Sequence, residues 1–155
     1  MELYQLIYQS QSLVPFEEPE LKALLNHSRA YNQAHGITGI LLYTLDGRFL
    51  QVLEGSREAV RHLYFDCIRA DPRHYNWQII GDGPCVQRSF ADWSMYFRGA
   101  QARDLRKLLS PVPADTPALL IPRPRTRPEL LALLRDFVAG PETAASQRWQ
   151  LETEA

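Results

Sequence analysis

A hairpin near the middle of the chain constrains the fold more than any other feature. Residues 37–43 (ITGILLY) are nearly all apolar, as expected for a central strand that is covered on both faces. The turn Leu45-Asp46-Gly47 carries the Asp-Gly signal for a tight connection between strands. Residues 48–54 (RFLQVLE) are therefore expected to pair antiparallel with the preceding strand.

Gln51 is the unusual residue of this hairpin. Side chains alternate between the faces of a strand, so Phe49, Gln51 and Leu53 are expected to share one face. A primary amide between two large apolar side chains is expected to be buried. A buried amide needs partners for two donor hydrogens and an acceptor oxygen. The groups that bond to the Gln51 amide are therefore expected to mark a functional site.

Strand and helix patterns alternate on either side of the hairpin. Residues 2–9 predict a first strand with Tyr8 on one face, and residues 17–32 predict a helix that stops at His35-Gly36. The inward stripe of this helix begins with leucines, Leu24 among them, and ends with the polar residues Ser28 and Asn32. A second helix is expected to begin at the N-cap Ser56 and to end before Pro72, with Cys67 and Ile68 in its buried stripe. Residues 76–81 and 93–97 predict two more strands, and Trp93 and Met95 are expected to share a face of the last one.

The order βαββαββ predicts an α+β sandwich. Right-handed crossovers place both helices on one face of a mixed five-stranded sheet, with the first and third strands as neighbours. Helices predicted at residues 102–110 and from Pro128 to about residue 139, on either side of a proline-rich loop, are expected to cover the opposite face. The polar tail at residues 142–155 is expected to be disordered.

Composition excludes several classes of function. The 155 residues carry a net charge of −1, which argues against binding to nucleic acid or to an anionic membrane. The sequence has no apolar run long enough to span a bilayer and no signal-peptide pattern, so a cytoplasmic protein is expected. The two cysteines, Cys67 and Cys85, lack metal-binding spacing and are expected to be reduced core thiols, and the four histidines predict no metal site.

Three polar residues are expected to point into the layer between the sheet and the first two helices. They are Tyr8, Gln51 and Asn32. One interpretation is a set of core residues that satisfy one another, with the Tyr8 hydroxyl bonded to the Gln51 amide. The other is a planar polar ligand whose edge meets Asn32 and Gln51, with aliphatic side chains against its faces. The residues alone leave both interpretations open.

Five segments resemble those of BLUF domains, the blue-light receptors that bind a flavin. They are LIYQS, SRAYNQAHGITGILLY, GRFLQVLEG, DPRH and DWSM, and the resemblance runs from about Glu2 to Gly99. It implies a ferredoxin-like fold with the flavin ring between the two helices, above the sheet. FAD is the expected flavin, with FMN and riboflavin as alternatives.

The resemblance also implies a role for individual residues. Tyr8 and Gln51 match the photoactive pair: light drives electron and proton transfer from the tyrosine through the amide, which then rotates or tautomerises and bonds differently to the flavin. Trp93 and Met95 match the pair that relays the signal. The positions that match flavin-binding residues are Leu24, Ser28, Asn32, Phe49, Ile68, Asp71, Arg73 and His74.

Cys67 departs from the family pattern, because many members carry a basic residue there, and this puts the choice of flavin in doubt. Tyr31 matches a variable position; it is expected either on the adenine or ring side of the flavin or, as the favoured interpretation, at the surface.

The expected organisation is a BLUF domain at residues 1–99, a helical cap at residues 100–141 and the tail. With no room for a cyclase or phosphodiesterase domain, the chain is expected to be a sensor rather than an enzyme, to act on a separate effector protein and to form a homo-oligomer. Two alternatives remain. One is a regulatory module that binds a small molecule without photochemistry. The other is an acylphosphatase-like enzyme, which the first loop (SQSLVPF) opposes because it has neither arginine nor a glycine cradle.

Overall fold

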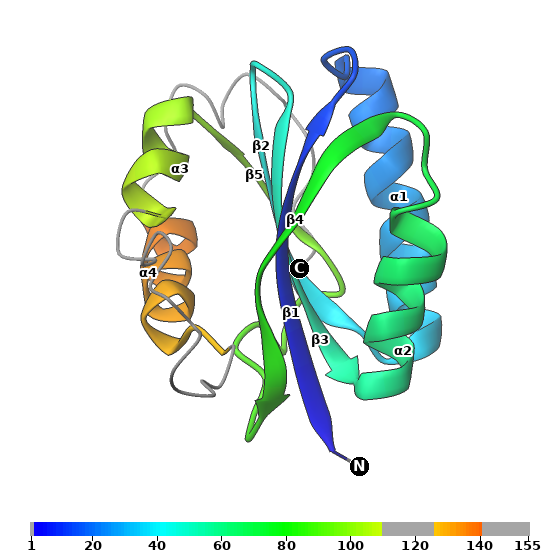
Figure 1. The fold of residues 1–155 in the computed structure, drawn as a ribbon, viewed down its shortest axis with the longest axis vertical. Coiled ribbons are helices and arrows are strands. Elements are labelled where there is room, and N and C mark those ends of the chain that lie inside the picture. Colours follow the sequence, from blue (N-terminus) through cyan, green and yellow to red (C-terminus); the bar gives the residue numbers. More distant parts are fainter. Residues whose placement is uncertain (1, 110–125, 141–155) are drawn as a thin grey trace, which may run out of the picture.

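A five-stranded sheet lies between two helical layers in the computed structural model, which describes residues 2–109 and 126–140 (Figure 1). The first part of the chain forms β1 (Leu3–Ser12), α1 (Glu18–His35), β2 (Thr38–Thr44), β3 (Arg48–Ser56), α2 (Arg57–His62), a π-helical turn η1 (Leu63–Ile68), β4 (His74–Cys85) and β5 (Tyr96–Ala100). The helices α3 (Ala102–Leu109) and α4 (Pro128–Ala139) follow. The predicted order βαββαββ and the α+β class are confirmed. The predicted tail and most of the proline-rich loop lie outside the described residues.

The strands are arranged in the order β4-β1-β3-β2-β5. β3 pairs antiparallel with both β1 and β2, β1 pairs antiparallel with β4, and β2 and β5 are parallel. The predicted hairpin and the predicted contact between the first and third strands are therefore confirmed. In this register Tyr8 lies directly opposite Gln51.

The predicted turn and cap residues mark the ends of the elements. Gly36 ends α1 in the left-handed conformation, with φ of 66°. Gly47 in the hairpin turn has φ of 88°, and a Cβ atom there would lie 2.3 Å from the Ser12 hydroxyl oxygen. The Ser56 hydroxyl accepts a hydrogen bond from the Ala59 N–H (3.2 Å) and caps α2 as predicted.

Each face of the sheet has its own apolar core. α1 and α2 cover one face, and α3 and α4 cover the other, as Figure 1 shows. The core on the α1–α2 face includes Leu6, Leu21, Leu25, Phe49, Leu53 and Tyr64, and that on the α3–α4 face includes Ile7, Ile40, Leu42, Val52, Leu105 and Leu134. The expectation that the C-terminal helices cover the second face is confirmed.

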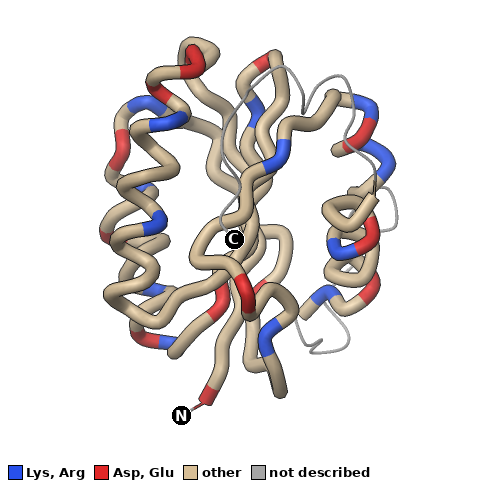
Figure 2. Tube along the Cα trace, turned by 180° about the vertical axis from the view of Figure 1, so that it is seen from behind, with Lys and Arg blue, Asp and Glu red and all other residues tan. Residues whose placement is uncertain are grey.

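Charged residues of both signs are interspersed over the two helical layers, as Figure 2 shows. None of the helices that the structure describes is long and apolar enough to cross a membrane.

The second helix differs from its prediction after His62. It continues as the π-helical η1, in which the Arg69 N–H donates to the Tyr64 carbonyl five residues earlier (2.9 Å). A π-turn holds more residues than an α-turn, so the inward stripe shifts along the sequence. Cys67, predicted to be a core thiol, is consequently exposed, and Cys85 is half-buried.

The last two strands also differ from their predictions. β4 is longer at both ends than the predicted residues 76–81, and β5 begins at Tyr96 rather than at Trp93. Trp93 and Met95 therefore precede the strand and do not share a face. Met95 is fully buried in the core of the α1–α2 face, and Trp93 packs against the core of the α3–α4 face.

Candidate functional site

A cavity of about 250 Å³ lies on the α1–α2 face, between α1, η1 and the sheet. Its lining residues are Tyr8, Leu24, His27, Ser28, Tyr31, Asn32, Leu41, Phe49, Gln51, Leu63, Cys67, Ile68, Asp71, Arg73 and His74. The structure thus brings the predicted photoactive pair and all the predicted flavin-binding positions around one space. Of the two predicted relay residues, neither lines it.

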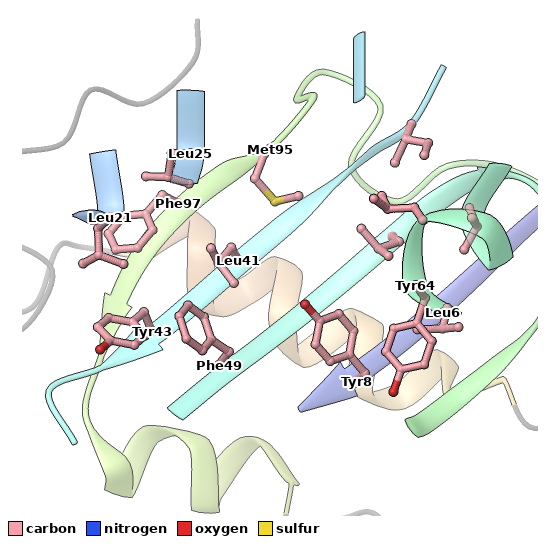
Figure 3. Close-up of a cluster of buried hydrophobic side chains, with 14 of the residues drawn as sticks. Leu6, Tyr8, Leu21, Leu25, Leu41, Tyr43, Phe49, Tyr64, Met95 and Phe97 are labelled. Atoms are coloured by element: carbon pink, nitrogen blue, oxygen red, sulfur yellow. The ribbon is translucent and has the colours of Figure 1, made fainter. Parts of the chain in front are cut away.

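The Tyr8–Gln51 pair forms the floor of the cavity. These residues are cross-strand partners on β1 and β3, so their side chains leave the sheet side by side. The Tyr8 hydroxyl donates to Gln51 Oε1, and both residues are buried. On its other side, Gln51 Nε2 donates to Met95 Sδ (3.6 Å). Figure 3 shows Tyr8, Phe49 and Met95 on the same face of the sheet, with Met95 entering from the segment before β5.

Burial keeps the Tyr8 hydroxyl protonated. The ring lies 4.9 Å from that of Tyr64 and 6.0 Å from that of Trp77, measured between centroids. Desolvation raises the pKa of Tyr8 far above its usual value, and the nearby Tyr64 and Asp71 act in the same direction. The hydroxyl is therefore a hydrogen-bond donor at neutral pH.

Asn32 joins α1 to the segment that carries Met95. It is 1% exposed in the last turn of α1, and its Nδ2 donates to the Ser94 carbonyl (2.6 Å). One turn earlier, Arg29 Nε donates to the Met95 carbonyl (2.9 Å). Two consecutive backbone carbonyls, those of Ser94 and Met95, are thus hydrogen-bonded to side chains of α1.

An ion pair and an imidazole lie at the end of the cavity next to β4. Arg73 donates to both carboxylate oxygens of Asp71, with the shortest distance 2.6 Å, and this bonding lowers the pKa of Asp71. The His74 ring lies 4.7 Å from that of Phe49 and 5.1 Å from that of Trp77. Burial lowers the pKa of His74, against the effect of Asp71, so its imidazole is neutral at pH 7.

The sequence did not single out several residues of this site. His27 and Tyr31 line the cavity because they lie three and seven residues after Leu24, on the same helical stripe, and this spacing was the available signal. Tyr31, for which the surface was favoured over a position beside the flavin, is half-buried and lines the cavity, with its ring stacked on that of His35 at 4.0 Å. Cys67 lines the cavity although it is exposed. Ser94 takes part through its backbone, for which a sequence carries no signal.

Comparisons with known proteins identify the family of the chain. The model of the BLUF family, described as sensors of blue-light using FAD, matches residues 3–96. The photoactivated adenylate cyclase subunit beta of Euglena longa is 36% identical over 94 residues, which are 60% of this chain and 11% of that protein. The chain spans about a tenth of the length of the curated relatives that it matches.

Solved structures match nearly the whole chain. The photo-activated state of BlsA superposes with a TM-score of 0.68 at 28% identity and covers 91% of this chain and 98% of its own. The dark state of the BLUF protein BlrB superposes with a TM-score of 0.64 at 33% identity and covers 89% and 96% of the two chains. A sequence match over more than half of the chain and a shared fold lead to one conclusion. The chain belongs to the BLUF family of blue-light sensors that use a flavin.

Proposed function

We propose that this protein senses blue light with a flavin held in the cavity and with Tyr8 and Gln51 as the photoactive pair. The observation that carries the proposal is the buried bond from the Tyr8 hydroxyl to the Gln51 amide in the floor of a cavity beside the sheet. The position of this pair on a cavity wall supports a role toward a bound ring.

The chemistry of the cavity suits a flavin ring. The carboxamides of Asn32 and Gln51 provide donors and acceptors for the carbonyl and imide groups along the ring's polar edge. Leu24 on α1 and Ile68 on η1 provide apolar walls. Phe49, a further wall residue, is 1% exposed and held by the aromatic cluster of Tyr43 and His74.

The size and charge of the cavity bear on which flavin binds. Its volume of about 250 Å³ is slightly below the roughly 300–1,000 Å³ typical of ligand pockets. It is therefore suited to the ring, with the rest of the molecule outside. Arg73 is the one arginine or lysine among the described residues of the lining, and Asp71 neutralises it. We propose that FAD binds mainly through its ring, and that FMN and riboflavin bind with similar affinity.

A flavin held in the cavity would supply a blue-absorbing group that can accept an electron and a proton and give them back. Tyr8 is the donor of both, because its protonated hydroxyl bonds to the Gln51 carbonyl oxygen. When Tyr8 gives up its proton, its oxygen changes from a donor to an acceptor. The Gln51 amide then rotates so that its NH₂ group faces the tyrosine oxygen. The electron and the proton return to Tyr8, and the rotated amide is the change that persists in the lit state. A carboxamide suits this change because its two ends have nearly the same shape and opposite hydrogen-bonding character.

The output follows from the contact that the rotation breaks. In the structure Gln51 Nε2 bonds to Met95 Sδ, and Met95 leads directly into β5. Rotation puts a carbonyl oxygen against the sulfur, which removes this bond. We propose that the displaced Met95 signals through β5, α3 and α4 to a separate effector protein, and that the chain acts as a homo-oligomer without catalytic activity of its own.

Light-induced absorption spectroscopy tests the proposal. Protein purified in darkness is expected to be yellow, and blue light is expected to shift its flavin absorption to the red, with recovery in darkness. Tyr8→Phe and Gln51→Leu are expected to keep the colour and abolish the shift. A colourless protein that fails to take up added FAD contradicts flavin binding, and a normal shift in either variant contradicts the assigned roles.

A further inference from the structure

Glu54 is a buried carboxylate for which the photochemical steps give no use. It lies three residues after Gln51 on β3, is 0% exposed, and points toward the α3–α4 face, away from the cavity. Its Oε2 accepts from the Ser89 N–H (2.6 Å), and its Oε1 accepts from the Phe90 N–H (2.9 Å) and the Thr38 hydroxyl (3.1 Å). A buried carboxylate is costly unless it is well bonded, so its partners indicate what it holds.

Arg88 fastens the same stretch of chain to the sheet. Its Nη1 donates to the Glu54 carbonyl (3.1 Å) and to the Thr38 hydroxyl (2.9 Å), and its Nη2 donates to the Gly36 carbonyl (2.8 Å). We call residues 88–95 the crossing segment, because the chain passes there from the α3–α4 face to the α1–α2 face. Glu54 and Arg88 hold its beginning.

The end of the crossing segment is bonded to the candidate site. The Gly39 N–H donates to the Trp93 carbonyl (3.0 Å). The carbonyls of Ser94 and Met95 accept from Asn32 and Arg29, and the Met95 sulfur accepts from Gln51. Between its two ends, which are both hydrogen-bonded to the rest of the protein, the crossing segment is short and contains a hydrogen bond of its own. The Trp93 N–H donates to the Phe90 carbonyl (3.2 Å), and the two rings stack with centroids 6.5 Å apart.

We propose that Glu54 is a positioning residue that fixes Met95 against Gln51 by holding the crossing segment from the opposite face of the sheet. We expect a movement of Phe90 to displace Met95, because the hydrogen-bonded turn from Phe90 to Trp93 is short and connects the two residues directly. The effect on the lit state rests on the proposed function, whereas the effect on the position of Met95 does not.

The substitution Glu54→Gln removes the carboxylate charge and one acceptor oxygen while it keeps the volume of the side chain. The carboxylate accepts from three donors, whereas an amide has one acceptor oxygen and an NH₂ group that would face a backbone N–H. The N–H of Ser89, which is partly buried, or that of Phe90, which is buried, then loses its partner. Glu58→Gln is the matched control, because it makes the same chemical change at an exposed position on α2.

The chain offers a clean probe of Met95. It has two methionines, Met1 and Met95, so selective methyl labelling gives two NMR signals. In darkness, E54Q is expected to shift the Met95 methyl signal. Amide hydrogen exchange at Ser89 or Phe90 is expected to be about fivefold faster, because a lost hydrogen bond is worth roughly 1 kcal/mol. In light, recovery of the dark spectrum is expected to change severalfold. E58Q is expected to match the wild type throughout.

An E54Q protein with flavin bound and an unchanged Met95 signal overturns the proposal, and so does one that loses stability without moving Met95. If E54Q does not fold, Thr38→Val removes one bond to the carboxylate and one bond from Arg88, and it is expected to shift the Met95 signal in the same direction by less. No shift in T38V then overturns the proposal. A wild type without a red shift overturns the proposed function instead, because the two dark measurements need no photochemistry.

Discussion

Met95 and Trp93, two residues apart in the chain, lie on opposite faces of the sheet. Met95 bonds through its sulfur to Gln51 on the α1–α2 face, and Trp93 packs with Phe90 and Tyr96 against the core of the α3–α4 face. We expect a displacement of one to be transmitted to the other side of the sheet. Of the predicted relay pair, Met95 contacts Gln51, and Trp93 packs against the core of the α3–α4 face.

Met95→Leu tests the sulfur contact. Leucine has nearly the same apolar volume, so the expected cost in the free energy of unfolding is below about 1.5 kcal/mol. Gln51 Nε2, however, loses its acceptor in the dark state. We expect M95L to keep the flavin and its red shift and to recover from the lit state severalfold more slowly, as measured by absorbance after a blue pulse. Equal recovery rates in M95L and wild type would contradict the assigned contact.

The pH dependence of the photocycle tests the burial of Tyr8. Its pKa in the folded protein is raised above the value of about 10 for an exposed tyrosine. A pKa raised on folding means that the protonated form is favoured in the native state. This contribution to stability is complete below about pH 10 and is lost as the pH rises through the folded-state pKa. We expect the size of the red shift to be constant up to about pH 10, while exposed tyrosines already titrate in absorbance at 295 nm. A red shift that disappears together with that titration would show that Tyr8 is accessible to solvent.

Cys67 is expected to report on the occupancy of the cavity. It is exposed and lines the cavity, whereas Cys85 is half-buried and burial raises the pKa of its thiol. The two thiols therefore differ in reactivity, because the thiolate is the reacting form. We expect N-ethylmaleimide to modify Cys67 first, bound FAD to slow this reaction at least severalfold, and the modified apoprotein to lose FAD binding. Mass spectrometry after timed quenching measures the rates, with Cys67→Ser as the control. Equal rates with and without FAD would place the thiol outside the binding site.

A cation at residue 67 tests how much the phosphates contribute to flavin binding. Arg73 is already neutralised by Asp71, so the described lining offers no uncompensated arginine or lysine to a phosphate. A charge-assisted hydrogen bond is worth about 1.5–3 kcal/mol, so Cys67→Arg is expected to favour FMN over riboflavin by about tenfold or more in calorimetric titrations. Cys67→Ser, which adds no charge, is expected to leave the ratio unchanged. A ratio equal to that of the wild type in C67R would mean that the phosphate lies away from η1.

The sequence predicts the position of Gln51 well, because period-two alternation and the Asp-Gly turn are local signals that tertiary packing did not override. The same rules fail at Cys67, because the amino-acid sequence of η1 does not distinguish a π-helical turn from an α-helical one. The difference lies in the backbone hydrogen bonds, which a sequence pattern does not show. They fail also at Trp93-Ser94-Met95, where alternation imitates a strand. The backbone there bonds to the side chains of Arg29 and Asn32 on α1 and, once, to Gly39 on β2, and such long-range partners are not visible in a local pattern.

Arg98 is expected to hold the C-terminal helices on the sheet. It is 3% exposed on β5, its Nη1 donates to the carbonyls of Val138 (2.9 Å) and Gly140 (3.0 Å), and its guanidinium lies 5.2 Å from the centre of the Phe137 ring. A cation bonded to the last carbonyls of a helix stabilises that end of it.

Arg98→Ala removes both bonds and leaves buried carbonyls without this donor, so the free energy of unfolding is expected to fall by roughly 2–3 kcal/mol. Because the bonds lie at the end of α4, limited proteolysis is expected to cut α4 faster in R98A than in wild type, while flavin absorption in the dark stays the same. Arg135→Ala, at an exposed position on the same helix, is the control. An R98A protein as stable and as resistant to proteolysis as R135A would show that α4 is held by its apolar stripe alone.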